Sequence, residues 1–260
     1  MIEIKTVKGV NYIVEAGDRR SAVLKLIENG FSLEGAILYG INLEGVDLKG
    51  VNLSEVDFRD CVFKGTNFNG ANCSNTNFEG TNLHSANFSN ANLEGAIFKG
   101  TNLVGVNFNG AILKGANLGN AILYGADCSN ANFEGAVLKG ADFDSANLEG
   151  ANFKGANLEG AILYGANCNN TNFEGANLHG VNFNNACLKG ANFDSACWPL
   201  TCNVLYAIVD DRIRIQLLYH AAKPTGDIVD TDLKELLESE LFKKVVNKFH
   251  MIPKYCGKIV

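Results

Sequence analysis

The chain has 260 residues, 47% of them hydrophobic, and a formal net charge of −6 at pH 7. No apolar run approaches the ~18 residues of a membrane-spanning helix, and the first residues lack the apolar stretch of a signal peptide, so we expect a cytoplasmic protein without membrane contact. Residues 31–198 carry sixteen acidic and eight basic side chains, a net charge of −8, which disfavours direct binding to nucleic-acid phosphate.

The first thirty residues predict a small cap. Residues 2–15 alternate apolar and polar side chains around a Lys8-Gly9 turn, which indicates a hairpin. Residues 18–29 have the spacing of an amphipathic helix, with Asp18 as a possible N-cap and Gly30 as a stop. We expect residues 1–30 to cover the first layer of the array that follows them.

From residue 31 to residue 198 the chain repeats every five residues. Every fifth residue from Leu33 to Trp198 is Leu, Phe, Cys or Trp, in all thirty-four cases. The residue two places earlier is small or β-branched except at Phe31, and the residue between them is Asn or Asp in twenty-four cases. The fifth position is usually Gly, so the consensus is Ala-Asn-Leu/Phe-X-Gly.

This spacing predicts very short strands separated by tight turns. Five residues advance about 500° around an α-helix, so the pattern builds no helical stripe. In a strand, residues two apart share one side, which places the small residue and the Leu or Phe inside and the Asn outside. The X-Gly pair then turns the chain, and each strand pairs with copies above and below at ~4.8 Å, as in a parallel β-solenoid.

If each turn bends the chain by roughly 90°, four repeats close one coil of twenty residues. Charges twenty residues apart should then alternate in sign, because stacked opposite charges attract. Two ladders do so: Glu94, Lys114, Glu134, Lys154 and Glu174, and Arg59, Glu79 and Lys99. The thirty-four repeats then give about eight and a half coils, a rod of roughly 40 Å.

Segments such as Ala-Asn-Leu-Glu-Gly at 91–95 and Ala-Asn-Phe-Lys-Gly at 151–155 resemble the pentapeptide-repeat family. The resemblance covers about 168 residues and implies an all-β fold, a right-handed quadrilateral parallel β-helix. Ile41, Val46, Val51 and Val56 depart from the consensus Ala, and they predict first coils that are wider or turn differently.

Residues 199–260 predict a C-terminal cap made of a strand at 204–209 and helices at 211–222 and 232–249. This tail also contains residue types that bind zinc: Cys202, His220, His250 and Cys256. Antiparallel helices would place the two histidines at opposite ends. We therefore expect neither a metal nor a cofactor, with Cys202, His250 and Cys256 as the only metal candidates.

The eight cysteines show no disulfide framework. Cys73, Cys128 and Cys168 occupy positions otherwise filled by Leu or Phe, so we expect them to be small buried hydrophobes. The remaining cysteines are expected to be free thiols in a reducing compartment.

Apolar residues interrupt the polar outer surface on one expected face: Val104, Ile122, Tyr124, Ile162 and Tyr164. Asp142 and Asp144 lie between the two Ile–Tyr pairs. Exposed apolar residues can mark a contact site and Tyr is a favoured interface anchor, although scattered exposed apolar groups are also normal. We interpret this face as a candidate surface for another protein or for a second copy of the chain.

The sequence contains no catalytic constellation, which favours a non-enzymatic structural or protein-interaction module over an enzyme. The resemblance implies an alternative, because some pentapeptide-repeat proteins mimic duplex DNA and inhibit or protect DNA gyrase. A rod of about 40 Å matches about twelve base pairs, and the negative charge has the right sign. The ladders that alternate Glu with Lys, however, cancel charge locally, whereas a mimic needs continuous negative potential.

Overall fold

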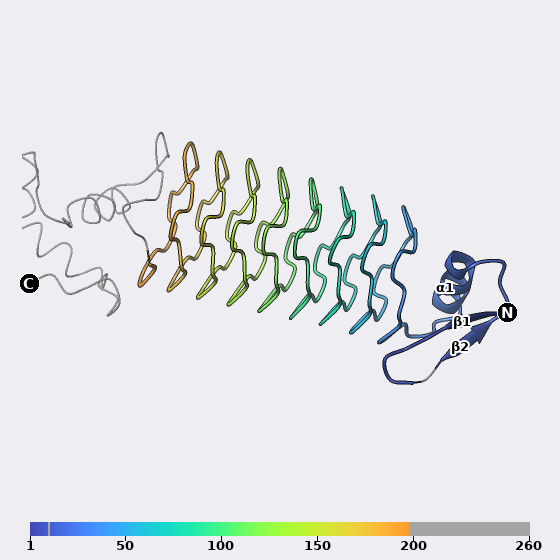
Figure 1. Ribbon diagram of the computed structural model, residues 1–260. Helices are drawn as coiled ribbons and strands as arrows, with labels where there is room; N and C mark the ends of the chain where they lie inside the picture. The colour runs from blue at the N-terminus through green and yellow to red at the C-terminus, as the bar shows by residue number, and fades with distance from the viewer. Residues whose placement is uncertain (10, 198–260) are drawn as a thin grey trace, which may run out of the picture.

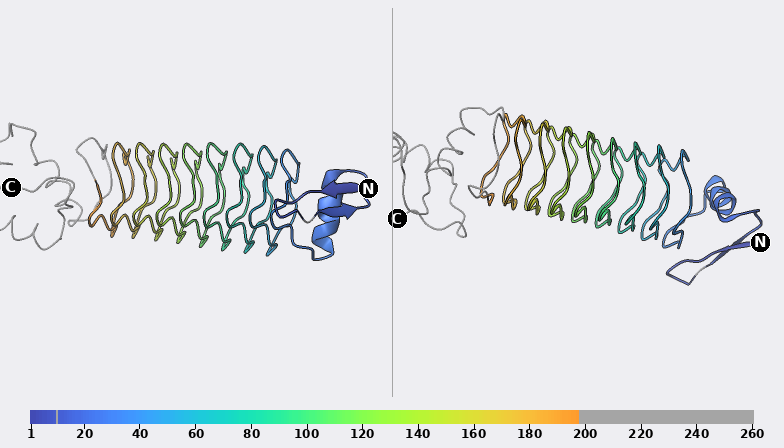
Figure 2. Two further views of the ribbon diagram at one scale, coloured as in Figure 1. Left: turned by 60° about the horizontal axis from the view of Figure 1, so that its bottom comes forward. Right: turned by 45° about the horizontal axis from the view of Figure 1, so that its top comes forward.

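The structure is a computed structural model that describes residues 1–9 and 11–197; the expected C-terminal cap, residues 199–260, lies outside these residues. A short N-terminal cap is followed by a long stack of flat coils (Figure 1). Two further views show the same regular layers along the stack (Figure 2). None of the helices in the described ranges combines the length and apolar character needed to span a bilayer.

The cap contains the predicted hairpin and helix. Strands β1 (Ile2–Ile4) and β2 (Tyr12–Val14) pair antiparallel. Helix α1 (Arg19–Glu28) begins after Asp18, whose carboxylate accepts a 2.7 Å hydrogen bond from the backbone of Ser21. It ends at Glu28, with Asn29 as the C-cap and Gly30 following at φ +72°, so the predicted Asp18 cap and Gly30 stop are confirmed.

Parallel backbone bridges join residues twenty positions apart along the whole stack, from the Ile37–Asp57 bridge to the Asn177–Cys197 bridge. In the interior coils, the N–H of the central residue donates to the next coil, and the N–H of the residue before it donates to the previous coil, as Leu93 and Asn92 do. The β-solenoid with four repeats in each coil is therefore confirmed. The same register holds in the first coils, where β-branched residues replace Ala, and the right-handed winding stays a prediction.

The interior is a continuous column of apolar side chains. All the Leu, Phe and Cys residues at the central repeat position from Leu33 to Phe193 are at most 1% exposed. Rings from successive coils stack in parallel, as between Phe133 and Phe153, with centroids 4.7 Å apart. Rings on neighbouring faces meet edge to face, as between Phe143 and Phe153 at 6.0 Å. The side chains of the solenoid fill its interior.

The fifth residue of each repeat turns the corner in the left-handed conformation, as the sequence predicts. Asn75 has φ +55° and Gly95, one coil later, has φ +67°. The two residue types are also complementary, because a Cβ on Gly95 would lie 2.4 Å from Oδ1 of Asn75. A larger residue at Gly95 would therefore displace the side chain of Asn75 in the preceding coil.

The cap satisfies backbone groups of the first coil that have no preceding coil to pair with. Lys5 C=O accepts from Ile37 N–H at 2.8 Å, and Val7 N–H donates to Gly35 C=O at 2.8 Å. Arg19 donates to the Ile37 carbonyl at 2.9 Å, and Arg20 donates to the carbonyls of two further residues in the same coil. The guanidinium groups thus replace N–H donors that a preceding coil would supply.

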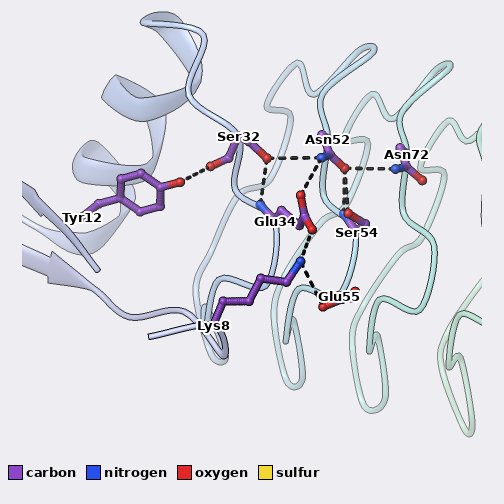
Figure 3. A network of polar contacts seen from close by, with 8 residues as sticks. All are labelled: Lys8, Tyr12, Ser32, Glu34, Asn52, Ser54, Glu55 and Asn72. Carbon is purple, nitrogen blue, oxygen red and sulfur yellow. Dashed lines mark hydrogen bonds and ion pairs between the residues drawn. The ribbon is translucent and has the colours of Figure 1, made fainter. Parts of the chain in front are cut away.

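A polar network continues this junction along one side of the rod (Figure 3). The Tyr12 hydroxyl donates to the Ser32 carbonyl at 2.8 Å, and Lys8 pairs with Glu34 and Glu55. The cap is therefore joined to the coils by backbone and side-chain contacts together.

Replacing both Arg19 and Arg20 with Ala should destabilise the chain by about 1 kcal/mol per arginine, because the carbonyl edge of the first coil loses its donors. It should also increase self-association through that open edge. Urea unfolding and sedimentation velocity measure both effects. Lys99→Ala, which removes only an exposed ion pair with Glu79, is the control and should change neither. A double variant as stable and monomeric as the control would contradict this role for the arginines.

The buried cysteines should resist alkylation in the folded protein. Cys73, Cys128 and Cys168 are fully buried, and burial raises the pKa of their thiols, which suppresses the reactive thiolate. Cys187 is half-exposed and should react with iodoacetamide first, as peptide mass spectrometry would measure. A sample unfolded in urea should be labelled at all of these positions. Equal native rates at Cys128 and Cys187 would argue against the inward column.

Candidate functional site

The four repeats of each coil give the rod four faces. We use the name Tyr face for the stacked repeats centred on residues 103, 123, 143, 163 and 183. It contains all five residues of the predicted interaction surface. Ile122, Tyr124, Ile162 and Tyr164 are 44%, 51%, 39% and 42% exposed, respectively, and Val104 is half-buried.

The register places the two Ile–Tyr pairs on either side of one acidic coil. Backbone bridges connect Ile122 to Asp142 and Asp142 to Ile162. The second row follows the same order, since Gly125 N–H donates to Asp144 C=O at 2.9 Å and Ser145 N–H donates to Tyr164 C=O at 2.8 Å. The Tyr face therefore presents two parallel rows, each apolar, acidic and apolar over three successive coils.

The two carboxylates in the middle coil are half-exposed and have only local hydrogen bonds. Asp142 accepts from the backbone of Asp144 at 3.0 Å, and Asp144 accepts from the Ser145 hydroxyl at 2.6 Å. No cation in the described part of the chain forms an ion pair with either residue. Two uncompensated negative charges thus lie between the apolar pairs.

Other faces hold their outward side chains in coil-to-coil ladders. On one face the Asn92 amide donates to Asn72 at 3.1 Å, and similar bonds continue along that face and two others. Among the described residues, the four repeats of the Tyr face centred on residues 103, 123, 143 and 163 have no such amide bond and no coil-to-coil ion pair. The exposed side chains of Ile122, Tyr124, Ile162 and Tyr164 therefore remain available to a partner.

The charge ladders form in part. Lys114 pairs with Glu134 at 3.5 Å and Lys154 with Glu174 at 3.0 Å, so each lysine selects one of its two stacked neighbours. The ion pair of Lys139 with Glu159 at 2.9 Å was not predicted, although the same twenty-residue spacing could have identified it.

Arg59 stacks in register with Glu79, as the twenty-residue coil predicts, but forms its ion pair within its own repeat. The Arg59 guanidinium pairs at 2.6 Å with Asp57 of its own repeat instead of with Glu79. Asp57 is two residues away on the same strand, so it is closer than the neighbouring coil and accepts two bonds from one fork. This pairing holds the pKa of the Asp57 carboxyl below its usual range.

At the outward positions of the other faces, three further exposed apolar residues were not predicted from the sequence: Tyr39, Ile112 and Val137. Ile112 lies between Asn92 and Asn132 in its row, and Val137 also has Asn on both sides, so each stands alone. Tyr39 instead belongs to a pentapeptide, Ala-Ile-Leu-Tyr-Gly at 36–40, that recurs unchanged at 121–125 and 161–165 on the Tyr face. That recurrence is the signal that could have linked Tyr39 to the Tyr face.

The first copy of this pentapeptide is already occupied by a helix. The Arg19 guanidinium of α1 lies over the Tyr39 ring, 5.7 Å from its centroid, and donates to the carbonyls of Ile37 and Tyr39. The chain thus contains one example of an Ile–Tyr repeat that binds an arginine from a helix.

Among the described residues, no group of three or more His, Cys, Asp or Glu side chains could hold a metal ion. The candidates Cys202, His220, His250 and Cys256 lie outside those residues, so the prediction about them remains untested.

Solved structures similar to this chain include a trypsin-treated variant of QnrB1, a plasmid-mediated fluoroquinolone resistance protein, at 20% identity and a TM-score of 0.56, covering 74% of this chain and all of that one. HetL, a pentapeptide-repeat protein involved in heterocyst differentiation regulation in Nostoc sp. strain PCC 7120, is 27% identical with a TM-score of 0.32, covering 76% of this chain and 98% of that one. The QnrB1 likeness supports the fold alone. Among curated proteins, none matches the chain.

Two family models match the array. The model described as pentapeptide repeats matches four overlapping segments between residues 101 and 194, and the model described as a pentapeptide repeat region matches residues 31–118. Their matches follow one another along the same stack of coils whose register and burial are described above. Taken together they span the rod from its first coil nearly to its last, and the chain belongs to the pentapeptide-repeat family.

Proposed function

We propose that the chain is a non-enzymatic interaction module that binds another protein through the Tyr face. The observation that carries this proposal is the pair of exposed Ile–Tyr repeats in register on a face where the polar ladders stop. Exposed Tyr and Ile side chains that lie together contribute apolar contact area at little entropic cost.

The filled interior supports a surface role. The central column is buried from Leu33 to Phe193, so chemistry has no lined cavity inside the described coils and function must use outward side chains. We also propose a cytoplasmic location, in keeping with the free thiols of Cys61, Cys73, Cys128, Cys168 and Cys187.

Replacing Ile122 and Ile162 with Asn should weaken partner binding by about tenfold or more, since both apolar pairs lose a member. The fold should persist, because Asn occupies the same position in the adjoining coils at residues 102 and 182. The immobilised full chain would be used to capture partners from an extract of the native host, with recovery measured by quantitative mass spectrometry.

The matched control is the double substitution Ile112→Asn and Val137→Asn, the same kind of change on other faces. It should leave recovery of the partner unchanged, and thermal melting should be the same for both double variants within a few degrees. Equal recovery by the wild type and both variants would refute a role for the Tyr face.

A modulator of DNA gyrase is the second candidate. The fold likeness to a fluoroquinolone resistance protein favours it, as do a rod of roughly 40 Å and an acidic array. The coil-to-coil pairs of Lys114, Lys139 and Lys154 with glutamates argue against it, because they neutralise charge along two faces.

We expect purified gyrase to supercoil plasmid DNA at an unchanged rate in the presence of micromolar amounts of this chain, with or without a fluoroquinolone. The physical reason is the interrupted negative potential described above. Inhibition of supercoiling, or protection from the drug, would move the assignment to the second candidate.

A further inference from the structure

We propose that the partner segment on the Tyr face is an amphipathic helix lying along the rod, with an arginine seated between Tyr124 and Tyr164 and opposite Asp142 and Asp144. This inference rests on the proposed function and specifies the chemistry of its partner.

The negative charge of the Tyr face determines the charge of its partner. Asp142 and Asp144 are uncompensated within the described residues and are flanked on both sides by exposed apolar pairs. A partner that covered both pairs would remove water from the carboxylates between them. Burying two carboxylates without a counter-charge is unfavourable, so the partner needs a cation between two apolar groups.

The tyrosines beside the carboxylates determine which cation fits the site. The tyrosines lie one coil to either side of Asp144, about 4.8 Å along the axis, which is within reach of a cation over an aromatic ring. A guanidinium can stack against a ring and donate two bonds to carboxylates, whereas an ammonium is a compact point charge. Arginine therefore fits this site better than lysine.

The chain itself provides the precedent. The identical pentapeptide at 36–40 binds Arg19 of helix α1, which lies over Tyr39 and donates to backbone carbonyls at the open edge of the first coil. In the middle of the rod those acceptors are used, since Tyr124 C=O accepts from Gly105 N–H and Ile122 C=O accepts from Leu103 N–H. At the Tyr face, Asp142 and Asp144 supply acceptors in their place.

The spacing of the two tyrosines along the rod determines the secondary structure of the partner segment. Tyr124 and Tyr164 are two coils apart, or roughly 9.6 Å along the axis. Residues seven apart on one side of a helix are separated by about 10.5 Å, with a third residue midway between them. Side chains on one side of an extended strand recur at about 6.6 and 13.2 Å, and neither value matches. A helix can therefore place an apolar, a basic and a second apolar side chain opposite the three successive coils of the Tyr face.

A second copy of this chain fits less well. A two-fold axis that set Tyr124 of one copy against Tyr164 of the other would pass beside Asp142 and Asp144. Four carboxylates would then meet at the centre of the contact without a cation.

The test uses the full chain and three fluorescent helical peptides of about sixteen residues, a length that supports a helix. Each carries two leucines seven positions apart on one side, with Arg, Lys or Glu midway between them. Fluorescence anisotropy should show the Arg peptide binding about tenfold more tightly than the Glu peptide, with Lys between them and with weaker binding at high salt.

Asp142→Asn with Asp144→Asn should abolish the preference for Arg over Glu while the chain remains folded, because Asn occupies the equivalent positions in the coil at residues 182 and 184. Equal affinity for the Arg and Glu peptides, a preference that survives these substitutions, or binding of none of the peptides would overturn the proposal. A dimer in solution that Ile122→Asn with Ile162→Asn dissociates would overturn it too, in favour of a second copy.

The same variants separate this inference from the proposed function. If the captured partner is lost with the isoleucine substitutions and retained with the aspartate substitutions, the Tyr face binds a partner but not through an arginine. If neither pair of substitutions reduces capture, both proposals fail.

Discussion

The structure depends on a backbone ladder in which each interior repeat donates two hydrogen bonds to the following coil and one to the preceding coil. Leu93 N–H donates to Ile112 C=O at 2.7 Å, and Asn92 N–H donates to Ala71 C=O at 2.9 Å. Adjacent residues thus bind opposite neighbours, so each repeat must keep its five-residue length. One inserted residue would turn the Leu or Phe outward and the Asn inward, and the error would persist through every later coil.

The ladder also determines which side chains are free to vary. The central position must fill the interior column, and the corner position must accept a left-handed backbone. The position before the centre carries Asn because its amide bonds both its own turn and the preceding coil: the Asn92 side chain accepts from Glu94 N–H and donates to Asn72. The residues that are free to recognise a partner are therefore those that replace Asn and those at the X position.

Much of this fold follows from the sequence because the rule is local and repeated. Burial of Leu33 to Phe193, the left-handed corners and the limits of α1 at Asp18 and Gly30 depend on short-range pattern and chain geometry. The ion pairs could not be predicted from the sequence, since a long side chain can reach several acceptors at similar distance. Arg59, for example, pairs with the acceptor in its own repeat.

The cap contacts were also out of reach of sequence reasoning. That Arg19 and Arg20 bind carbonyls of the first coil depends on where α1 lies against it, and no repeat fixes that placement. The exposure of the Tyr face was predictable from register, but its meaning was not, because a pattern of outward residues does not identify what covers them. Residues 199–260 have no repeat from which a register could be derived, and they lie outside the described part of the chain.

The distribution of departures from Asn distinguishes tolerated variation from a site. Ile112 and Val137 each stand between two asparagines in their rows, as expected of isolated substitutions on a surface that accepts them. Ala-Ile-Leu-Tyr-Gly occurs three times with all five residues unchanged, although the fold constrains only the inward and corner positions. One copy binds an arginine from α1, and the other two stand in register around a pair of carboxylates. Packing alone does not require outward Ile and Tyr together, so their shared recurrence is best explained by what they bind.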